Sequence, residues 1–241
     1  MKISIVIPAF NEEKLLGATL ASVERAAESF RRRGWSVETI VCDNNSTDRT
    51  AEIALDHGAS VVFEPVNQIG RARNRGASAA SGDWLVFVDA DSHPSAELFD
   101  DVAAAVLSGR HIAGGSTVQM DTRAPGALLM IALWNLTSRV NRWFAGSFIF
   151  CDAAAFRAVG GFSHEHFVSE EIDLSRRLKE LAKTEGRRLT ILHRSPLLTS
   201  ARKLRLYSRG EHVRFLLRLA WGRGRAIRER ENCAIWYDGR R

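Results

Sequence analysis

The sequence is poor in cysteine and has no long apolar run. Its 241 residues include three cysteines, Cys42, Cys151 and Cys233, which are widely spaced and form no CxxC pair. This argues against a disulfide framework and a structural zinc site, and it favours a reducing compartment. No stretch reaches the roughly 18 apolar residues of a membrane-spanning helix, and the N-terminal apolar run is too short for a signal peptide. We therefore expect a cytoplasmic protein.

What is present suits one globular α/β domain with an accessory segment. Hydrophobic residues make up 45% and charged residues 26% of the chain. A chain of this size and composition can bury a full hydrophobic core without disulfides or a structural metal. The net charge of +6 is concentrated near the end, where residues 200–241 hold twelve Lys or Arg and four Asp or Glu. We expect residues 201–241 to form a basic, amphipathic helical extension. It either docks on the body or lies on an anionic membrane surface as a peripheral contact.

Short apolar runs alternate with helical patterns in the first half. Residues 3–7 read as a buried strand that Pro8 ends. Asn11 is expected to cap the next helix, with Glu12 and Glu13 in its first turn. Further strands are expected at residues 37–42, 60–64, 83–88, 112–120, 147–151 and 188–192. Further helices are expected at residues 47–55, 71–80, 96–107, 126–140, 152–158 and 169–184. This alternation predicts βαβ units and a parallel sheet, with a less regular second half.

Acidic residues follow three of the predicted strands. Glu12 follows the first strand, Asp43 the second, and Asp89 and Asp91 the fourth. In an open parallel sheet, ligands bind beyond the carboxyl ends of the strands. Each acid alone reads as an ordinary turn or helix-dipole residue, but together they predict a binding crevice.

Asp89-Ala90-Asp91 is the sharpest of these signals. Mg²⁺ and Mn²⁺ take oxygen ligands, and one or two carboxylates plus substrate phosphates commonly hold them. Taken without its context, the same tripeptide is more often an acidic turn before a helix capped near Ser95. After a buried strand of a βαβ unit, it predicts a divalent metal site.

The order and spacing of seven motifs resemble glycosyltransferase family 2, inverting enzymes with the GT-A fold. The motifs are VIPAFNEE (6–13), VCDNNSTDRT (41–50), GRARNRG (70–76), ASGD (80–83), VFVDAD (86–91), GGF (160–162) and EEIDLSRRL (170–178). The resemblance covers residues 1 to about 200. It implies a Rossmann-like, mostly parallel sheet flanked by helices, in which residues 1–95 bind the nucleotide sugar and residues 96–200 the acceptor.

The resemblance also implies roles for single residues. Those implied to bind the nucleotide sugar are Pro8, Ala9, Phe10, Glu12, Asp43, Arg71, Arg73, Asp89 and Ala90. Within this set, Asp43 would accept a hydrogen bond from the base, and Arg71 or Arg73 would face the base or the diphosphate. Those implied to hold Mg²⁺ or Mn²⁺ are Asp91, Asp89 and His193, the last at a position where many relatives place a metal-binding histidine.

The predicted base lies at the start of a helix. A nucleotide diphosphate neutralised by a metal leaves readily, so the enzyme needs one base for the acceptor hydroxyl. Relatives usually read Glu-Asp where this chain has Glu170 and Glu171, and the second acid is their presumed base. Glu171 is one methylene longer, which leaves the choice between the two open, while Asp173 would brace this helix or contact phosphate. Without the resemblance, these acids would read as helix-dipole residues.

The sequence thus predicts a metal-assisted transferase that moves a sugar from a UDP- or GDP-linked donor to an acceptor hydroxyl, and the resemblance alone implies inversion. The acceptor is not identified, and a lipid-linked one is an option. Two alternatives stay open, a non-catalytic GT-A-like binding protein and a sugar-phosphate nucleotidyltransferase. The latter usually carries a Gly-rich loop where this chain reads PAFNE. No nucleic-acid-binding signature is present, so no nucleic-acid partner is expected.

Overall fold

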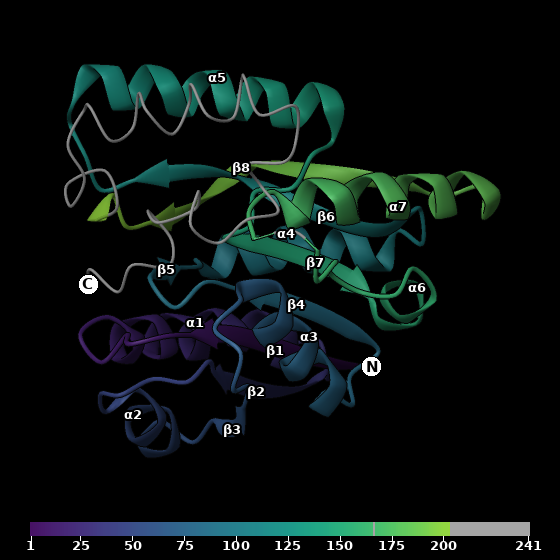
Figure 1. Cartoon of the computed structure of the whole chain (residues 1–241). Coiled ribbons are helices and arrows are strands. Elements are labelled where there is room, and N and C mark those ends of the chain that lie inside the picture. Colours follow the sequence, from purple (N-terminus) through teal and green to yellow (C-terminus); the bar gives the residue numbers. More distant parts are fainter. Residues whose placement is uncertain (166, 203–241) are drawn as a thin grey trace.

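The computed structural model describes residues 1–165 and 167–202 (Figure 1). The expected basic helix of residues 203–241 lies outside the described part. Within that part, an eight-stranded sheet has the order β3-β2-β1-β4-β7-β6-β8-β5. Its strands are β1 (Lys2–Ala9), β2 (Ser36–Asp43), β3 (Ser60–Phe63), β4 (Trp84–Val88), β5 (Ser92–His93), β6 (His111–Met120), β7 (Phe148–Asp152) and β8 (Arg188–Thr199).

The direction of the strands divides the sheet. Strands β3, β2, β1 and β4 are parallel, as the alternation of strands and helices predicts. Strand β7 pairs antiparallel with both β4 and β6, whereas β6 and β8 are parallel. Because β7 runs against β4, the residues just before β7 lie beside the carboxyl end of β4, where the backbone N–H of Asp89 donates to the carbonyl of Ser147.

Helices cover both faces of the sheet. The helices are α1 (Leu16–Arg31), α2 (Thr50–Asp56), α3 (Ile69–Ala79), α4 (Ala96–Leu107), α5 (Pro125–Asn141), α6 (Ala153–Ala158) and α7 (Glu170–Thr184). Ile3, Ile5 and Ile7 of β1 point into the core that α1 and α4 complete, and Val6 points into the opposite core with α6 and α7. A strand buried on both faces explains the continuous apolar run that the sequence shows there.

Helix α3 packs very closely on β1. A Cβ atom added to Gly76 would lie 2.4 Å from Cγ1 of Val6, so only glycine permits this approach. Gly70, Ala72, Arg73 and Gly76 form the buried side of α3. The close approach therefore presses Arg73, one turn before Gly76, against the sheet.

The start of α1 differs from the prediction. Asn11 does not cap the helix, which begins at Leu16 without a side-chain cap. Asn11 instead takes the left-handed backbone region (φ 53°), which asparagine tolerates, and its side chain accepts the N–H of Thr47 at 2.8 Å. Asn11 therefore ties the loop after β1 to the loop after β2.

Strand β8 is longer than the prediction, which ended it at residue 192. The register with β6 jumps from Ser116↔Leu192 to Val118↔Leu197, and this irregularity accommodates Pro196 within the strand. The far end of β8 pairs with the unpredicted two-residue strand β5. The extended strand carries the chain back to the site, where the N–H of Ser200 donates to the carbonyl of Asp91 at 3.1 Å.

Helix α5 lies along one margin of the molecule, above β6 and β8 (Figure 1). It packs through a small cluster in which Ile131 meets Val118 and Ala145. In the described part of the chain, no helix has both the length and the apolar character needed to cross a bilayer.

Candidate functional site

The predicted strand-end acids meet at one edge of the sheet. Strand β1 lies between β2 and β4, so the residues that follow these three strands are neighbours. Glu12, Asp43 and Asp91 are all buried there. Buried carboxylates require partners or protons, so the contacts of each acid show how this edge is organised.

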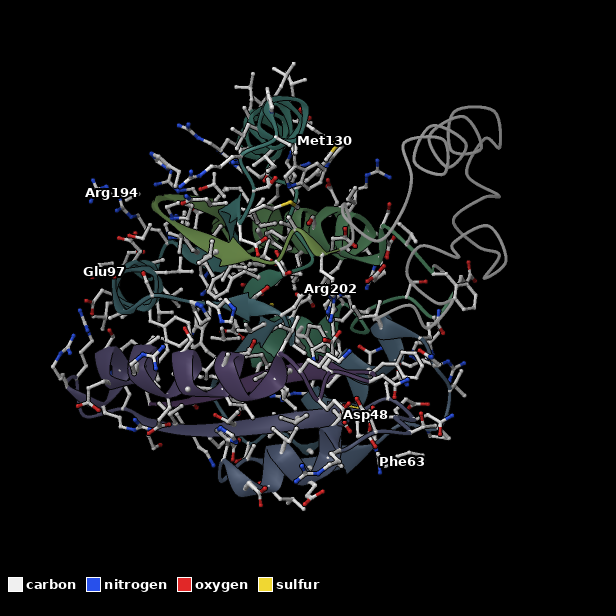
Figure 2. All side chains as sticks on the ribbon, turned by 90° about the vertical axis from the view of Figure 1, so that its left-hand side faces the viewer. Asp48, Phe63, Glu97, Met130, Arg194 and Arg202 are labelled. Atoms are coloured by element: carbon white, nitrogen blue, oxygen red, sulfur yellow. The ribbon has the colours of Figure 1, made fainter. Side chains whose placement is uncertain are left out.

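Arg202 supplies the positive charge for two of the acids. Its Nη1 atom lies 2.8 Å from Oε2 of Glu12, and its Nη2 atom lies 2.7 Å from Oε1 of the same carboxylate. The Nη2 atom also lies 3.5 Å from Oδ2 of Asp91. In Figure 2, Arg202 stands between the purple and blue N-terminal layer and the green layer that contains β8. Arg202 therefore joins the ends of β1 and β4 electrostatically.

Arg73 forms a second, deeper cluster. Its side chain is 1% exposed, and it lies 2.7 Å from Oε1 of Glu170 and 2.9 Å from Oδ1 of Asp89. It also donates to the carbonyl of Gly146 at 2.8 Å, and its guanidinium carbon lies 5.2 Å from the centre of the Phe162 ring. Arg73 thus links an acid at the end of β4 with the first acid of α7.

Glu170 and Glu171 occupy different environments at the start of α7. Glu170 is 3% exposed and is bound by Arg73, whereas Glu171 keeps intermediate exposure. Dense packing on its inner side raises the pKa of Glu171 to about 8, with the neighbouring Glu170 carboxylate adding to the rise and Arg73 opposing it. A carboxyl group with this pKa becomes a carboxylate, the form that a general base needs, as pH rises through about 8.

Gly146 closes this cluster from the side of β7. A Cβ atom at this position would lie 3.2 Å from Nη2 of Arg73 and 3.5 Å from the carboxyl carbon of Glu171. The absent side chain leaves room for both groups. Gly146, together with Ser147, whose carbonyl accepts the N–H of Asp89, therefore belongs to the site, which the sequence did not predict.

Asp173 belongs to a set of contacts that holds α7, the helix of Glu170 and Glu171, in place. Its carboxylate pairs with Arg177 at 2.7 Å. Arg177 in turn donates to the carbonyls of Val159 and Gly161, where Gly161 has a left-handed backbone (φ 67°). This arrangement fixes α7 to the turn after α6 and places Asp173 in a supporting position.

The predicted nucleoside side surrounds the end of β2. Asp43 accepts the N–H of Ser46 at 3.0 Å, and Ala9 lies opposite Asp43 in the β1–β2 register. Pro8 and Ala9 are buried in β1, and Phe10 follows with intermediate exposure. Arg71 donates to the side chain of Gln68 at 3.0 Å. The strand order thus brings Ala9 and Asp43 together, and Arg71 lies in the first turn of α3.

Asp89 and Asp91 at the end of β4 are oxygen donors of the kind that hard divalent cations take, although each is paired with an arginine. Among the residues described, no three His, Cys, Asp or Glu side chains gather in a group that could hold a metal by themselves, and His193 is exposed within β8. Asp91, however, already shares one cationic partner with Glu12. One or two carboxylates together with substrate phosphates suffice for Mg²⁺.

Sequence reasoning missed Arg202, and it placed Arg73 in the site without predicting its ion pairs with Asp89 and Glu170. On the buried side of α3, Arg73 shares a face with Gly70 and Gly76, and an arginine among small residues on one helix face indicates burial against a partner. Arg202 left no such signal, because its partner Glu12 lies 190 positions away.

The sequence model of the family described as "Glycosyl transferase family 2" matches residues 4–158. An uncharacterized glycosyltransferase of Mycobacterium tuberculosis is 34% identical over 113 residues, which cover 47% of this chain and 47% of that protein. The chain thus spans about half the length of this curated relative.

Two solved structures show the same fold. Staphylococcus aureus TarS (residues 1–349) in complex with UDP gives a TM-score of 0.64 at 22% identity, covering 83% of this chain and 61% of TarS. The mannosyltransferase PcManGT of Pyrobaculum calidifontis in complex with GDP-Man and Mn²⁺ gives 0.67 at 16% identity, covering 88% and 59%.

Proposed function

Because the chain belongs to glycosyltransferase family 2, we propose that it transfers a sugar from a nucleotide-diphosphate sugar to an acceptor hydroxyl, with inversion and with the help of a divalent cation. Its fold is the GT-A fold of the solved structures above. The observation that carries the proposal is the placement of Asp89 between the strand-end acids and the acids of α7, through its ion pair with Arg73.

In this proposal, residues 1–95 bind the donor and residues 96–200 bind the acceptor. The edge formed by Pro8, Ala9, Phe10, Asp43 and Arg71 holds the nucleoside. UDP- and GDP-linked sugars are the favoured donors, since TarS was solved with UDP and PcManGT with GDP-Man.

Asp91, with Asp89, would hold Mg²⁺ or Mn²⁺. The cation supplies positive charge that stabilises the departing diphosphate. Arg202 already holds a positive charge beside Asp91, so its guanidinium and the cation would compete for the same carboxylate. Ala90 places the two acids on one turn, directly after the buried strand β4.

Glu171 is the proposed base. Its intermediate exposure gives an acceptor hydroxyl access, whereas Glu170 is buried in its ion pair with Arg73. Burial and the neighbouring Glu170 carboxylate raise the pKa of Glu171, and its deprotonated form, which increases as pH rises through about 8, accepts the proton of the acceptor hydroxyl. Arg73, Glu170 and Asp173 act as positioning residues.

A thermal-shift titration tests the donor part of this proposal. The full chain is titrated with UDP, GDP, CDP and TDP, each with and without Mn²⁺, because a ligand that binds only the native state raises the melting temperature. We expect a Mn²⁺-dependent rise with one nucleotide. Asp91→Asn should lose the Mn²⁺-dependent part, and no rise with any nucleotide would overturn the proposal.

Glu171→Gln separates binding from catalysis. This variant should keep the nucleotide-dependent rise and lose turnover of the matching sugar nucleotide. If the unchanged chain binds a nucleotide but never consumes the corresponding sugar nucleotide with any acceptor offered, the non-catalytic alternative replaces the transferase.

A further inference from the structure

Helix α5 exposes a continuous row of large apolar side chains. Leu129, Leu133, Leu136 and Val140 recur at steps of four, three and four, and they are 62%, 57%, 59% and 73% exposed. In Figure 2, α5 is seen along its axis, and its side chains project away from the body beside the labelled Met130. Steps of three and four place the row on one helix face. This row is called the α5 apolar row below.

The opposite face of α5 is the one that packs on the protein. Ile131 and Ser138 are buried, and Ile131 packs with Val118 of β6. A helix that is apolar on both faces is normally covered on both. Among the described residues, the α5 apolar row has no such cover, and an exposed row of this kind marks an interaction surface.

The charges around the α5 apolar row are positive. The helix itself has no acidic residue, and Arg139 lies in its last turn. Arg123 precedes the helix and Arg142 follows it, and all three arginines are exposed. The nearby acid, Asp121, accepts a hydrogen bond from the backbone N–H of Ala201. The surface therefore combines an apolar centre with a basic rim.

This charge decides among the candidate occupants. Residues 203–241 contain eleven Lys or Arg and four Asp or Glu, so the chain's own remaining segment has the same sign as the rim. A second copy meeting the same face would bring two basic rims together. An anionic lipid surface has the opposite sign, and it also accepts leucine side chains at the boundary between headgroups and acyl chains.

We propose that α5 docks on an anionic lipid bilayer surface. The α5 apolar row enters the headgroup boundary, and Arg123, Arg139 and Arg142 reach lipid phosphates while their aliphatic stems follow the apolar surface. This docking is independent of the proposed sugar transfer, because the α5 apolar row includes none of the donor-site residues.

Vesicle flotation of the full chain tests the proposal. The vesicles are phosphatidylcholine alone, or phosphatidylcholine with about a third phosphatidylglycerol. We expect binding to the anionic vesicles and weaker binding to the neutral ones. Leu133→Glu should reduce the partition coefficient on anionic vesicles about tenfold, because a charge replaces a leucine side chain that enters the headgroup boundary of the bilayer. Leu107→Glu is the matched control, since Leu107 on α4 is 63% exposed and should leave binding unchanged.

A second pair of measurements tests the basic rim. Arg139→Gln should lower binding to anionic vesicles about fivefold and leave binding to neutral vesicles unchanged, because each arginine near an anionic surface contributes about 1 kcal/mol. The proposal is overturned if the chain binds neither vesicle, or if Leu133→Glu binds as the unchanged chain does. It is also overturned if Leu133→Glu abolishes self-association by light scattering while vesicle binding persists, since a second copy would then occupy the face.

Discussion

Replacing Arg73 with methionine should destabilise the protein strongly. Methionine fills much of the space of the arginine stem but leaves Glu170 and Asp89, at 2.7 Å and 2.9 Å from the lost guanidinium, without their cation. Removing one partner of a buried ion pair costs about 3–5 kcal/mol. For a protein of about this size, 1 kcal/mol corresponds to roughly 2–4 °C. The melting temperature should therefore fall by about 6–20 °C.

The matched control is Arg49→Met. Arg49 also lies 2.9 Å from a carboxylate, that of Glu52, but its side chain is 65% exposed. Exposed pairs contribute about 0–1 kcal/mol, so the control should melt within a few degrees of the unchanged chain. Differential scanning calorimetry at pH 7.5 measures both variants side by side.

The pH dependence of the Arg73→Met deficit identifies its cause. Without the guanidinium, the folded-state pKa of the buried Glu170 carboxyl rises further above its unfolded value, so the variant loses stability as pH rises through that pKa. The deficit relative to the unchanged chain should thus be larger at pH 8 than at pH 5. Equal deficits at both pH values, or a loss below about 2 °C, would refute the account of Arg73 as the counter-ion of these carboxylates.

Two further predictions concern Glu171 and Arg202. Because the folded pKa of Glu171 is raised to about 8 by burial and by Glu170, its stabilising contribution is lost as pH rises from its unfolded value through 8. The melting temperature of Glu171→Gln, relative to that of the unchanged chain at the same pH, should therefore rise from pH 5 to pH 9. A difference between the two melting temperatures that stays constant with pH would contradict this. Arg202→Met removes the cation shared by Glu12 and Asp91, so Mn²⁺ alone should raise the melting temperature of this variant more than that of the unchanged chain. Equal Mn²⁺ shifts would show that arginine and metal do not compete.

Local periodicity predicted most of the fold. Residues 3–7 and 84–88 are apolar enough to indicate strands buried on both faces, and they lie within β1 and β4. The errors fall where distant contacts override local preference. Asn11 reads as a cap, but its contact with Thr47 holds it in a turn. The predicted strand ended at residue 192, but pairing with β6 and β5 carries β8 past Pro196.

The acids of the site and Arg73 were predictable from the sequence, but Arg202 and the ion-pair partners of Arg73 were not. Strand order alone brings Glu12, Asp43 and Asp91 to one edge, so their meeting follows from topology. Their partners come from far along the chain. Arg73 and Glu170 are 97 positions apart, and Glu12 and Arg202 are 190 apart. No local pattern encodes such pairs, because they depend on how the last strand closes the sheet.

The ion pair between Glu12 and Arg202 has a consequence for how the protein is made. The ribosome adds about 5–20 residues per second, so roughly 10–40 s separate the synthesis of these two residues. During that interval, pairing of β1 with β4 brings Glu12 and Asp91 to the same edge before Arg202, the cation they share, has been synthesised. Like charges that approach one another disfavour the ionised state. Within the described residues, the edge that holds these acids is therefore completed only after β8 has been made, and a polypeptide released before that point should lack the ion pairs of this edge.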